Sequence, residues 1–152
     1  MSPTNVGRPR VRWTSVLGLA VWGGLAFWTA NLAVSRTSFA AEYRSALSIA
    51  YAPMLLEAML GGLIVGLVVS YVLLRFHDVL PGRSSVGQSV VLSLVTLLIA
   101  TGLVELVGQS AASTDDPPRY FLIGLGLNVV RFLALGLVIG YLRKRNDSRA
   151  RR

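Results

Sequence analysis

Four apolar runs, each long enough to cross a lipid bilayer as a helix, take up most of the 152-residue chain. A helix needs about 20 predominantly apolar residues to span the hydrocarbon core, where its backbone polar groups must bond to one another. We therefore expect an all-α, polytopic membrane protein. The predicted four-transmembrane-helix bundle has spans at residues 13–34, 53–74, 86–107 and 120–142.

The composition favours a membrane protein over a soluble one. Hydrophobic residues make up 53% of the chain and charged residues 14%, whereas soluble domains carry roughly 25% charged residues. The net charge of +8 raises the question of nucleic-acid binding. The basic residues gather at the two ends and in one short loop. We therefore expect no nucleic-acid partner, and instead the lipid bilayer with anionic headgroups at its cytoplasmic face.

The distribution of arginine and lysine also predicts the orientation. The N-terminal segment, the loop after the second run and the C-terminal segment together hold 11 of the 15 basic residues. Such residues collect on the cytoplasmic side of a membrane protein. We therefore predict a plasma (inner) membrane protein with both termini cytoplasmic. Residues 1–12 are expected to be disordered, and residues 143–152 to form a basic tail.

The first run has an alternative interpretation as a cleaved signal peptide. A basic segment precedes it, and Ser38-Phe39-Ala40 resembles a cleavage site. Its length of about 20 residues exceeds the 7–15 residues typical of a signal-peptide core, which favours a permanent span.

The segment between the first and second runs carries Phe39, Tyr43 and Leu47 at intervals of four residues. This spacing is typical of a short amphipathic helix in the membrane interface, and equally of an N-terminal extension of the next helix. Two later helix starts show clearer signals. Pro53 suits the first turn of the second span, and Asp116 is placed to cap the fourth.

Small residues at four-residue spacing mark the helix surfaces that are expected to pack. They include Gly62 and Gly66 in the second run, and Gly136 and Gly140 in the fourth. GxxxG patterns let helix backbones approach closely, and close packing holds helices together in lipid. We expect the partner helices to lie in the same chain. A homo-oligomer or another membrane protein is the alternative.

The second and fourth runs also resemble each other. Residues 66–71 align with residues 136–141 at an offset of 70, and Arg75 aligns with Arg145 at the same offset. The first and third runs match more weakly, with Ser15-Val16 over Ser89-Val90 at an offset of 74. Two repeated helical hairpins related by an axis along the membrane normal would produce this pattern. Chance similarity is the alternative, since apolar spans use few residue types.

Three charged residues interrupt the apolar runs, namely Glu57, Glu105 and Arg131. Charged side chains inside a membrane are costly and normally face a partner, so we predict that Arg131 pairs with Glu57 or Glu105. Asn128 lies one turn from Arg131 on the same helix face and joins this candidate intramembrane polar cluster. The cluster is either a structural ion pair or the lining of an outward-facing cavity.

No catalytic or metal-binding pattern accompanies these charges. The chain has no cysteine and a single histidine, and it contains no nucleophile elbow, HExxH or Gly-rich phosphate loop. We therefore expect no enzymatic activity, no metal and no cofactor. The predicted function is a binding or accessory role in the membrane. The alternative is a small transporter or proton-coupled carrier that uses Glu57, Glu105 and Arg131.

Overall fold

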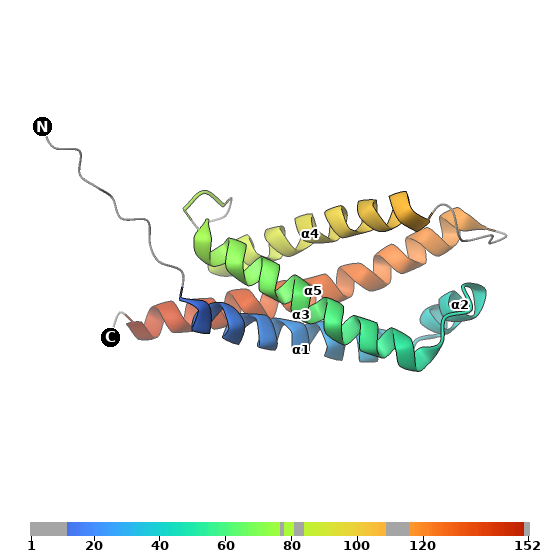
Figure 1. Ribbon diagram of the computed structural model, residues 1–152, viewed down its shortest axis with the longest axis horizontal. Coiled ribbons are helices and arrows are strands. Elements are labelled where there is room, and N and C mark those ends of the chain that lie inside the picture. Colours follow the sequence, from blue (N-terminus) through green and yellow to red (C-terminus); the bar gives the residue numbers. More distant parts are fainter. Residues whose placement is uncertain (1–11, 77, 81–83, 109–115, 151–152) are drawn as a thin grey trace, which may run out of the picture.

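The computed structural model describes residues 12–76, 78–80, 84–108 and 116–150, with the backbone alone at residues 104–108 and 150. The described residues form five helices: α1 (Trp13–Ser35), α2 (Ser38–Ala46), α3 (Tyr51–Arg75), α4 (Ser85–Gly108) and α5 (Pro117–Ala150) (Figure 1). All except α2 are long and apolar enough to cross a membrane. The predicted all-α bundle with four candidate spans is therefore confirmed.

The helix starts follow the capping chemistry expected from the sequence. Asp116 Oδ1 accepts a hydrogen bond from the Arg119 N–H at 3.3 Å, just before α5 begins. Thr37 Oγ1 accepts one from the Ala40 N–H at 3.3 Å at the start of α2. Pro53 lies in the first turn of α3, where its missing N–H leaves no hydrogen bond unmade.

The four long helices pack in the order α3, α1, α5, α4. α1 lies between α3 and α5, and α4 packs on α5 with only a light contact to α3. Figure 1 shows α3 and α4 close together at the turn that joins them and farther apart towards the end that carries α2. The start of α1 and the end of α5 lie at the opposite end, which we call the basic end. The core is made by Leu19, Phe27, Val69, Leu73, Leu97, Phe132, Leu135 and Ile139.

The glycines predicted to pack helices lie at two interfaces within the chain. Gly62 and Gly66 face α1, and Gly136 and Gly140 face α4. A Cβ atom on Gly66 would lie 3.3 Å from the Ala20 Cα, and one on Gly136 would lie 3.0 Å from the Val90 Cα. Only glycine therefore permits these backbone approaches. They join α1 to α3 and α4 to α5 as two hairpins.

Both hairpin interfaces have the same register. Ala20 faces Gly66 and Val90 faces Gly136, and the second pair lies 70 positions after the first. The first and third runs therefore correspond at an offset of 70, and the predicted offset of 74 for them is wrong. The side-chain match that suggested 74 is weak, whereas the backbone contacts set the register directly. A common offset in both helices supports two repeated hairpins.

The connector between α1 and α3 forms a separate helix rather than an extension of α3. Ser48 follows α2 with φ at +52°, a left-handed conformation that interrupts a right-handed helix. α5 in turn continues to Ala150, so residues 143–150 of the predicted tail are helical. An ion pair between Arg143 and Asp147, one helical turn apart, supports this extension. Of the segment predicted to be disordered, only Arg12 lies within the described residues.

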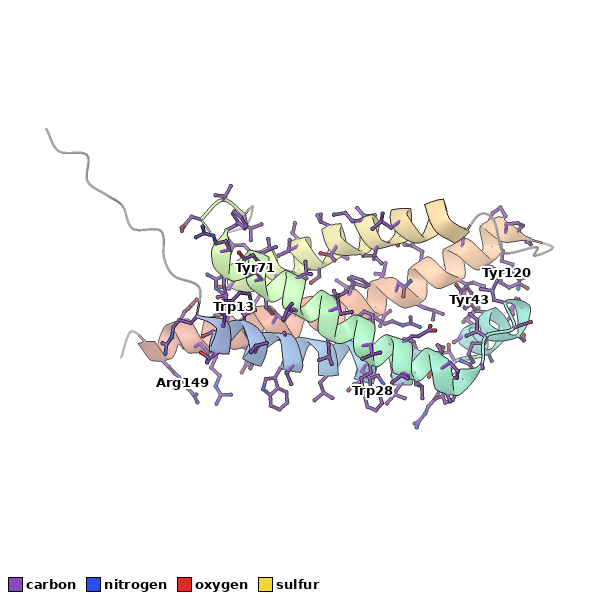
Figure 2. All side chains as sticks on the ribbon, in the orientation of Figure 1. Trp13, Trp28, Tyr43, Tyr71, Tyr120 and Arg149 are labelled. Atoms are coloured by element: carbon purple, nitrogen blue, oxygen red, sulfur yellow. The ribbon has the colours of Figure 1, made fainter. Side chains whose placement is uncertain are left out.

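Aromatic contacts join α1 to α3 near both ends of the bundle. Trp13 stacks on Tyr71 at the basic end, with ring centroids 5.7 Å apart. Nearer to α2, the Trp28 indole Nε1–H donates a hydrogen bond to the Leu55 carbonyl oxygen at 3.2 Å. Figure 2 shows Trp13 and Tyr71 together at the basic end, with Trp28 farther along α1. These contacts fix the register of α1 on α3.

Candidate functional site

Arg131 lies partly buried on α5 and bonds to Asn128 of the same helix. The Arg131 Nη1–H donates a hydrogen bond to Asn128 Oδ1 at 2.9 Å. The Nε atom of Arg131 is buried and has no hydrogen-bond partner among the described atoms. Leu135, one turn further on the same face, is fully buried. The guanidinium and the Asn128 amide are therefore partly buried, in line with the buried stripe of α5.

The predicted ion pair between Arg131 and Glu57 does not form. Glu57 is exposed, and within the described part of the chain its carboxylate pairs with no cation. Glu57 precedes Gly66 by nine residues, about two and a half helical turns, which puts it on the side of α3 opposite the face packed on α1. The Glu105 side chain lies outside the described residues, so its pairing with Arg131 stays a prediction.

A further polar side chain, Asn31 of α1, is completely buried. Its exposed fraction is 0%, and neither the nitrogen nor the oxygen of its amide has a hydrogen-bond partner among the described atoms. Burying an unpaired amide costs about 1–3 kcal/mol in proteins. Sequence reasoning missed this residue. The available signal was that Asn31 is the only amide side chain in the first apolar run.

The register of α1 on α5 puts Asn31 at the level of Asn128. The rings of Phe27 and Phe132 meet edge to face between these helices, with centroids 5.3 Å apart. Asn31 lies one turn beyond Phe27, and Asn128 lies one turn before Phe132. Since the two helices are antiparallel, both steps lead towards the α2 end. Asn31, Asn128 and Arg131 therefore lie at one level, which we call the polar layer. Asn31 is on the α1 face that packs on α3, because it follows Gly24 by seven residues and Gly24 contacts α3.

Tyr43 of α2 covers the polar layer at its outer side. A Cβ atom on Gly124 would lie 3.0 Å from the Tyr43 hydroxyl oxygen, so the glycine leaves the space that the phenol ring occupies. Burial raises the pKa of Tyr43, and the positive charge of Arg131 opposes this by lowering it. The phenol and the guanidinium are thus close enough to interact. Figure 2 shows Tyr43 beside the first turns of α5, near Tyr120.

α2 is tied to three neighbouring helices. Glu42 forms an ion pair with Arg119 of α5, with 2.6 Å between Oε1 and Nη2. The Arg44 Nη1–H donates a hydrogen bond to the Ser35 carbonyl oxygen of α1 at 2.8 Å, and its guanidinium lies 5.2 Å from the centroid of the Tyr51 ring of α3. These contacts hold Tyr43 above the polar layer.

The polar layer is bounded by aromatic groups along the bundle axis. The Phe27–Phe132 pair lies on the side of the basic end, and Tyr43 lies on the side of α2. Between them the side chains offer one positive charge and several hydrogen-bond donors. The described residues contain no cluster of three residues able to hold a metal ion. The layer therefore places one positive charge and several unpartnered polar atoms inside the bundle.

Comparison with known proteins gives no relative. The chain matches no protein-family model, no curated protein and no solved structure.

Proposed function

We propose that this protein is a membrane-embedded binding protein whose polar layer accommodates a polar group of a ligand. One observation carries this proposal: Arg131 is partly buried and bonds to Asn128, with its Nε atom unpartnered among the described atoms, while Glu57 lies exposed on another helix face. Charged residues inside a membrane domain are costly, and they commonly mark functional sites. Binding a polar ligand would satisfy the groups that the bundle leaves unpaired.

The proposed location is the plasma (inner) membrane, with both termini cytoplasmic. Arg12, Arg75, Lys144, Arg145 and Arg149 are all at the basic end. Described acidic side chains lie at both ends: Glu42, Glu57 and Asp116 at the α2 end, and Asp78 and Asp147 at the basic end. Basic residues collect on the cytoplasmic side and contact anionic headgroups there. The polar layer would then lie in the outer half of the bundle.

This orientation can be tested directly, because the chain has no cysteine. In intact cells, a membrane-impermeant maleimide should label Ser38→Cys in α2 and leave Ser148→Cys in α5 unlabelled until the membrane is permeabilised. The reverse labelling pattern would refute the proposed orientation.

The binding function is tested by the molecules that copurify with the protein. Wild type, Arg131→Leu and Glu57→Gln are purified in parallel, and the bound lipids and solutes are identified by mass spectrometry. We expect at least one species that is enriched on wild type and on Glu57→Gln and is depleted from Arg131→Leu. Glu57→Gln is the matched control because it removes a charge from an exposed position. Equal sets of bound species on all three proteins would contradict a binding role for the polar layer.

A small transporter or proton-coupled carrier is the second candidate. It is favoured by the light contact between α3 and α4, which leaves the two hairpins joined mainly through α1 and α5. The exposed position of Glu57 makes this residue a poor coupling group. A transporter should move a copurified ligand across the membrane of liposomes that contain the protein, and not across liposomes without it. If the ligand binds but is not transported, the protein is a binding protein and not a transporter.

A further inference from the structure

We propose that the two hairpins rock against each other as rigid bodies, with the basic end as the pivot. In this motion α3 closes on α4 at the α2 end while α1 separates from α5. The structure, in which α1 packs on α5 and α3 touches α4 only lightly, is one of two related arrangements. The motion goes beyond the proposed binding function and does not depend on it.

Each hairpin is held internally by close backbone contacts. In the first hairpin, a Cβ atom on Gly62 would lie 3.1 Å from the Gly24 carbonyl oxygen. In the second hairpin, the Ser89 hydroxyl group donates a hydrogen bond to the Gly136 carbonyl oxygen at 2.6 Å. Closely packed surfaces resist deformation and move as units. Relative motion is therefore expected between the hairpins and not within them.

The two contacts between the hairpins are related by the repeat but are unequal in packing. The offset of 70 relates α1 to α4 and α3 to α5, so it also relates the α1–α5 contact to the α4–α3 contact. α1 and α5 pack closely, whereas α3 and α4 do not. Membrane proteins built from repeats commonly change shape by rocking one repeat against the other. Exchange of the close and the light contact would be such a motion.

The side chains explain why one arrangement is favoured. The rings of Phe27 and Phe132 meet edge to face between α1 and α5. At the offset of 70, the corresponding residues of α4 and α3 are Leu97 and Gly62. Aromatic rings in this geometry attract each other beyond the burial of their surfaces, and a leucine beside a glycine has no such attraction. The arrangement with α1 on α5 is thus the more stable of the two.

The contacts at the basic end mark it as the pivot. The Arg143 guanidinium donates a hydrogen bond to the Leu73 carbonyl oxygen and so joins α5 to α3. One turn further into the bundle, Val69 and Ile139 are completely buried in the core. Figure 1 shows α3 and α4 close together at this end and farther apart towards the α2 end. Rocking about these contacts would move the helices most at the α2 end.

α2 acts as a strap that holds the observed arrangement. It belongs to the first hairpin, yet Glu42 forms an ion pair with Arg119 of α5. Tyr43 also packs on α5, in the space that Gly124 leaves. Separation of α1 from α5 would break both contacts. Their loss should therefore favour the second arrangement.

The experiment measures distances between spin labels on the full-length protein in lipid nanodiscs, since the chain has no cysteine of its own. Cysteine is introduced in pairs at four exposed positions at similar levels of the bundle, namely Thr29, Leu60, Leu98 and Val130. Leu60 with Leu98 and Thr29 with Val130 are the crossing pairs, because each joins the two hairpins. Thr29 with Leu60 and Leu98 with Val130 are the internal pairs. We expect two populations for each crossing pair, the minor one shorter between α3 and α4 and longer between α1 and α5, and one distance for each internal pair.

Two variants should raise the minor population. Glu42→Gln removes an exposed ion pair, which should raise the ratio of minor to major population about 1.5- to 5-fold. Phe132→Leu removes the aromatic pair and should raise this ratio about 2- to 10-fold. Arg36→Gln is the matched control, because it removes a charge from an exposed position at the same end, and it should leave the ratio unchanged. If Phe132→Leu does not fold, Glu42→Gln and the wild type still decide the outcome.

Several results would overturn the proposal. One narrow distance for both crossing pairs, in the wild type and in the variants, would make the two hairpins a single rigid body. Two distances for an internal pair would mean that the hairpins themselves come apart. A second pair of exposed positions near the pivot, Val68 with Val91, should give one distance, and two distances there would exclude the basic end as the pivot. Each of these results leaves the copurification test of the proposed function unaffected.

Discussion

Arg143 of α5 donates a hydrogen bond from Nη1 to the main-chain oxygen of Leu73 in α3, with 2.5 Å between the two atoms. Leu73 is in the last turn of α3, where carbonyl groups have no partner inside the helix. A buried cation here satisfies one such carbonyl and interacts favourably with the helix dipole. The two residues are 70 positions apart, the offset that relates the two hairpins.

Replacing Arg143 should loosen this contact between the hairpins. Hydrogen bonds to charged groups contribute about 1.5–3 kcal/mol, so Arg143→Gln should lower the free energy of unfolding by roughly that amount. Lys144→Gln, at the next and exposed position, should change it by less than about 0.5 kcal/mol. Unfolding in detergent, followed by circular dichroism, measures both. If both variants lose the same free energy of unfolding, positive charge in general stabilises this end, and not the hydrogen bond from Arg143 to Leu73.

Gly66→Ala should separate α3 from α1. The added Cβ atom would lie 2.7 Å from the Ala20 carbonyl oxygen, which is backbone and cannot rotate away. Overpacking of this kind costs about 1–3 kcal/mol. Gly18→Ala is the matched control, because nothing lies within 4 Å of its added Cβ atom. Since alanine favours a helix, this control should be neutral or slightly stabilising in the same unfolding assay. A neutral Gly66→Ala would argue against close packing at this position.

Asn31→Leu should stabilise the protein. The substitution removes a buried amide with two unpartnered atoms, which we expect to raise the free energy of unfolding by about 1–3 kcal/mol. Thermal and chemical unfolding of the purified protein measure this change. Destabilisation of the variant would instead mean that Asn31 has a structural partner.

Arg131 should be energetically coupled to Asn128 and independent of Glu57. In a double-mutant cycle, Arg131→Gln with Asn128→Ala should give an interaction free energy of about 0.5–3 kcal/mol, since the side chains are hydrogen-bonded. The cycle of Arg131→Gln with Glu57→Gln should give a value near zero, because Glu57 faces away from the α1 interface. The three single and two double variants are compared with the wild type by chemical unfolding. A large interaction free energy between Arg131 and Glu57 would support the ion pair predicted from the sequence.

Tyr43 should ionise only above its ordinary pKa of 10.0, because burial raises the pKa more than the charge of Arg131 lowers it. The folded-state pKa thus exceeds the unfolded one. The stability contributed by neutral Tyr43 is fully present below pH 10 and is lost as the pH rises through the folded-state value. Arg131→Gln should raise this pKa further by removing the lowering charge. The tyrosinate absorbance of each protein minus that of its Tyr43→Phe derivative gives the titration. If the pKa of Tyr43 is the same in Arg131→Gln as in the wild type, Arg131 and Tyr43 do not interact.

The four candidate spans and several helix starts could be predicted from the sequence. Run length and hydropathy are properties of consecutive residues, and they alone decide whether a segment can cross a membrane as a helix. Asp116 was likewise identified as a cap from its place before the fourth run, and it accepts a hydrogen bond there. Capping involves groups only three positions apart, so it needs no knowledge of the fold.

The partners of these helices and of Arg131 were decided by the tertiary structure. Glu57 was a reasonable counter-ion by depth, yet its direction depends on the rotation of α3, which the contact of Gly66 with Ala20 sets. Asn31 and Asn128 share a layer only because the Phe27–Phe132 contact fixes the register of α1 on α5. Rotation and register follow from the contacts of several helices at once. Periodicity shows which face of one helix is buried, but not which residue of another helix will meet it.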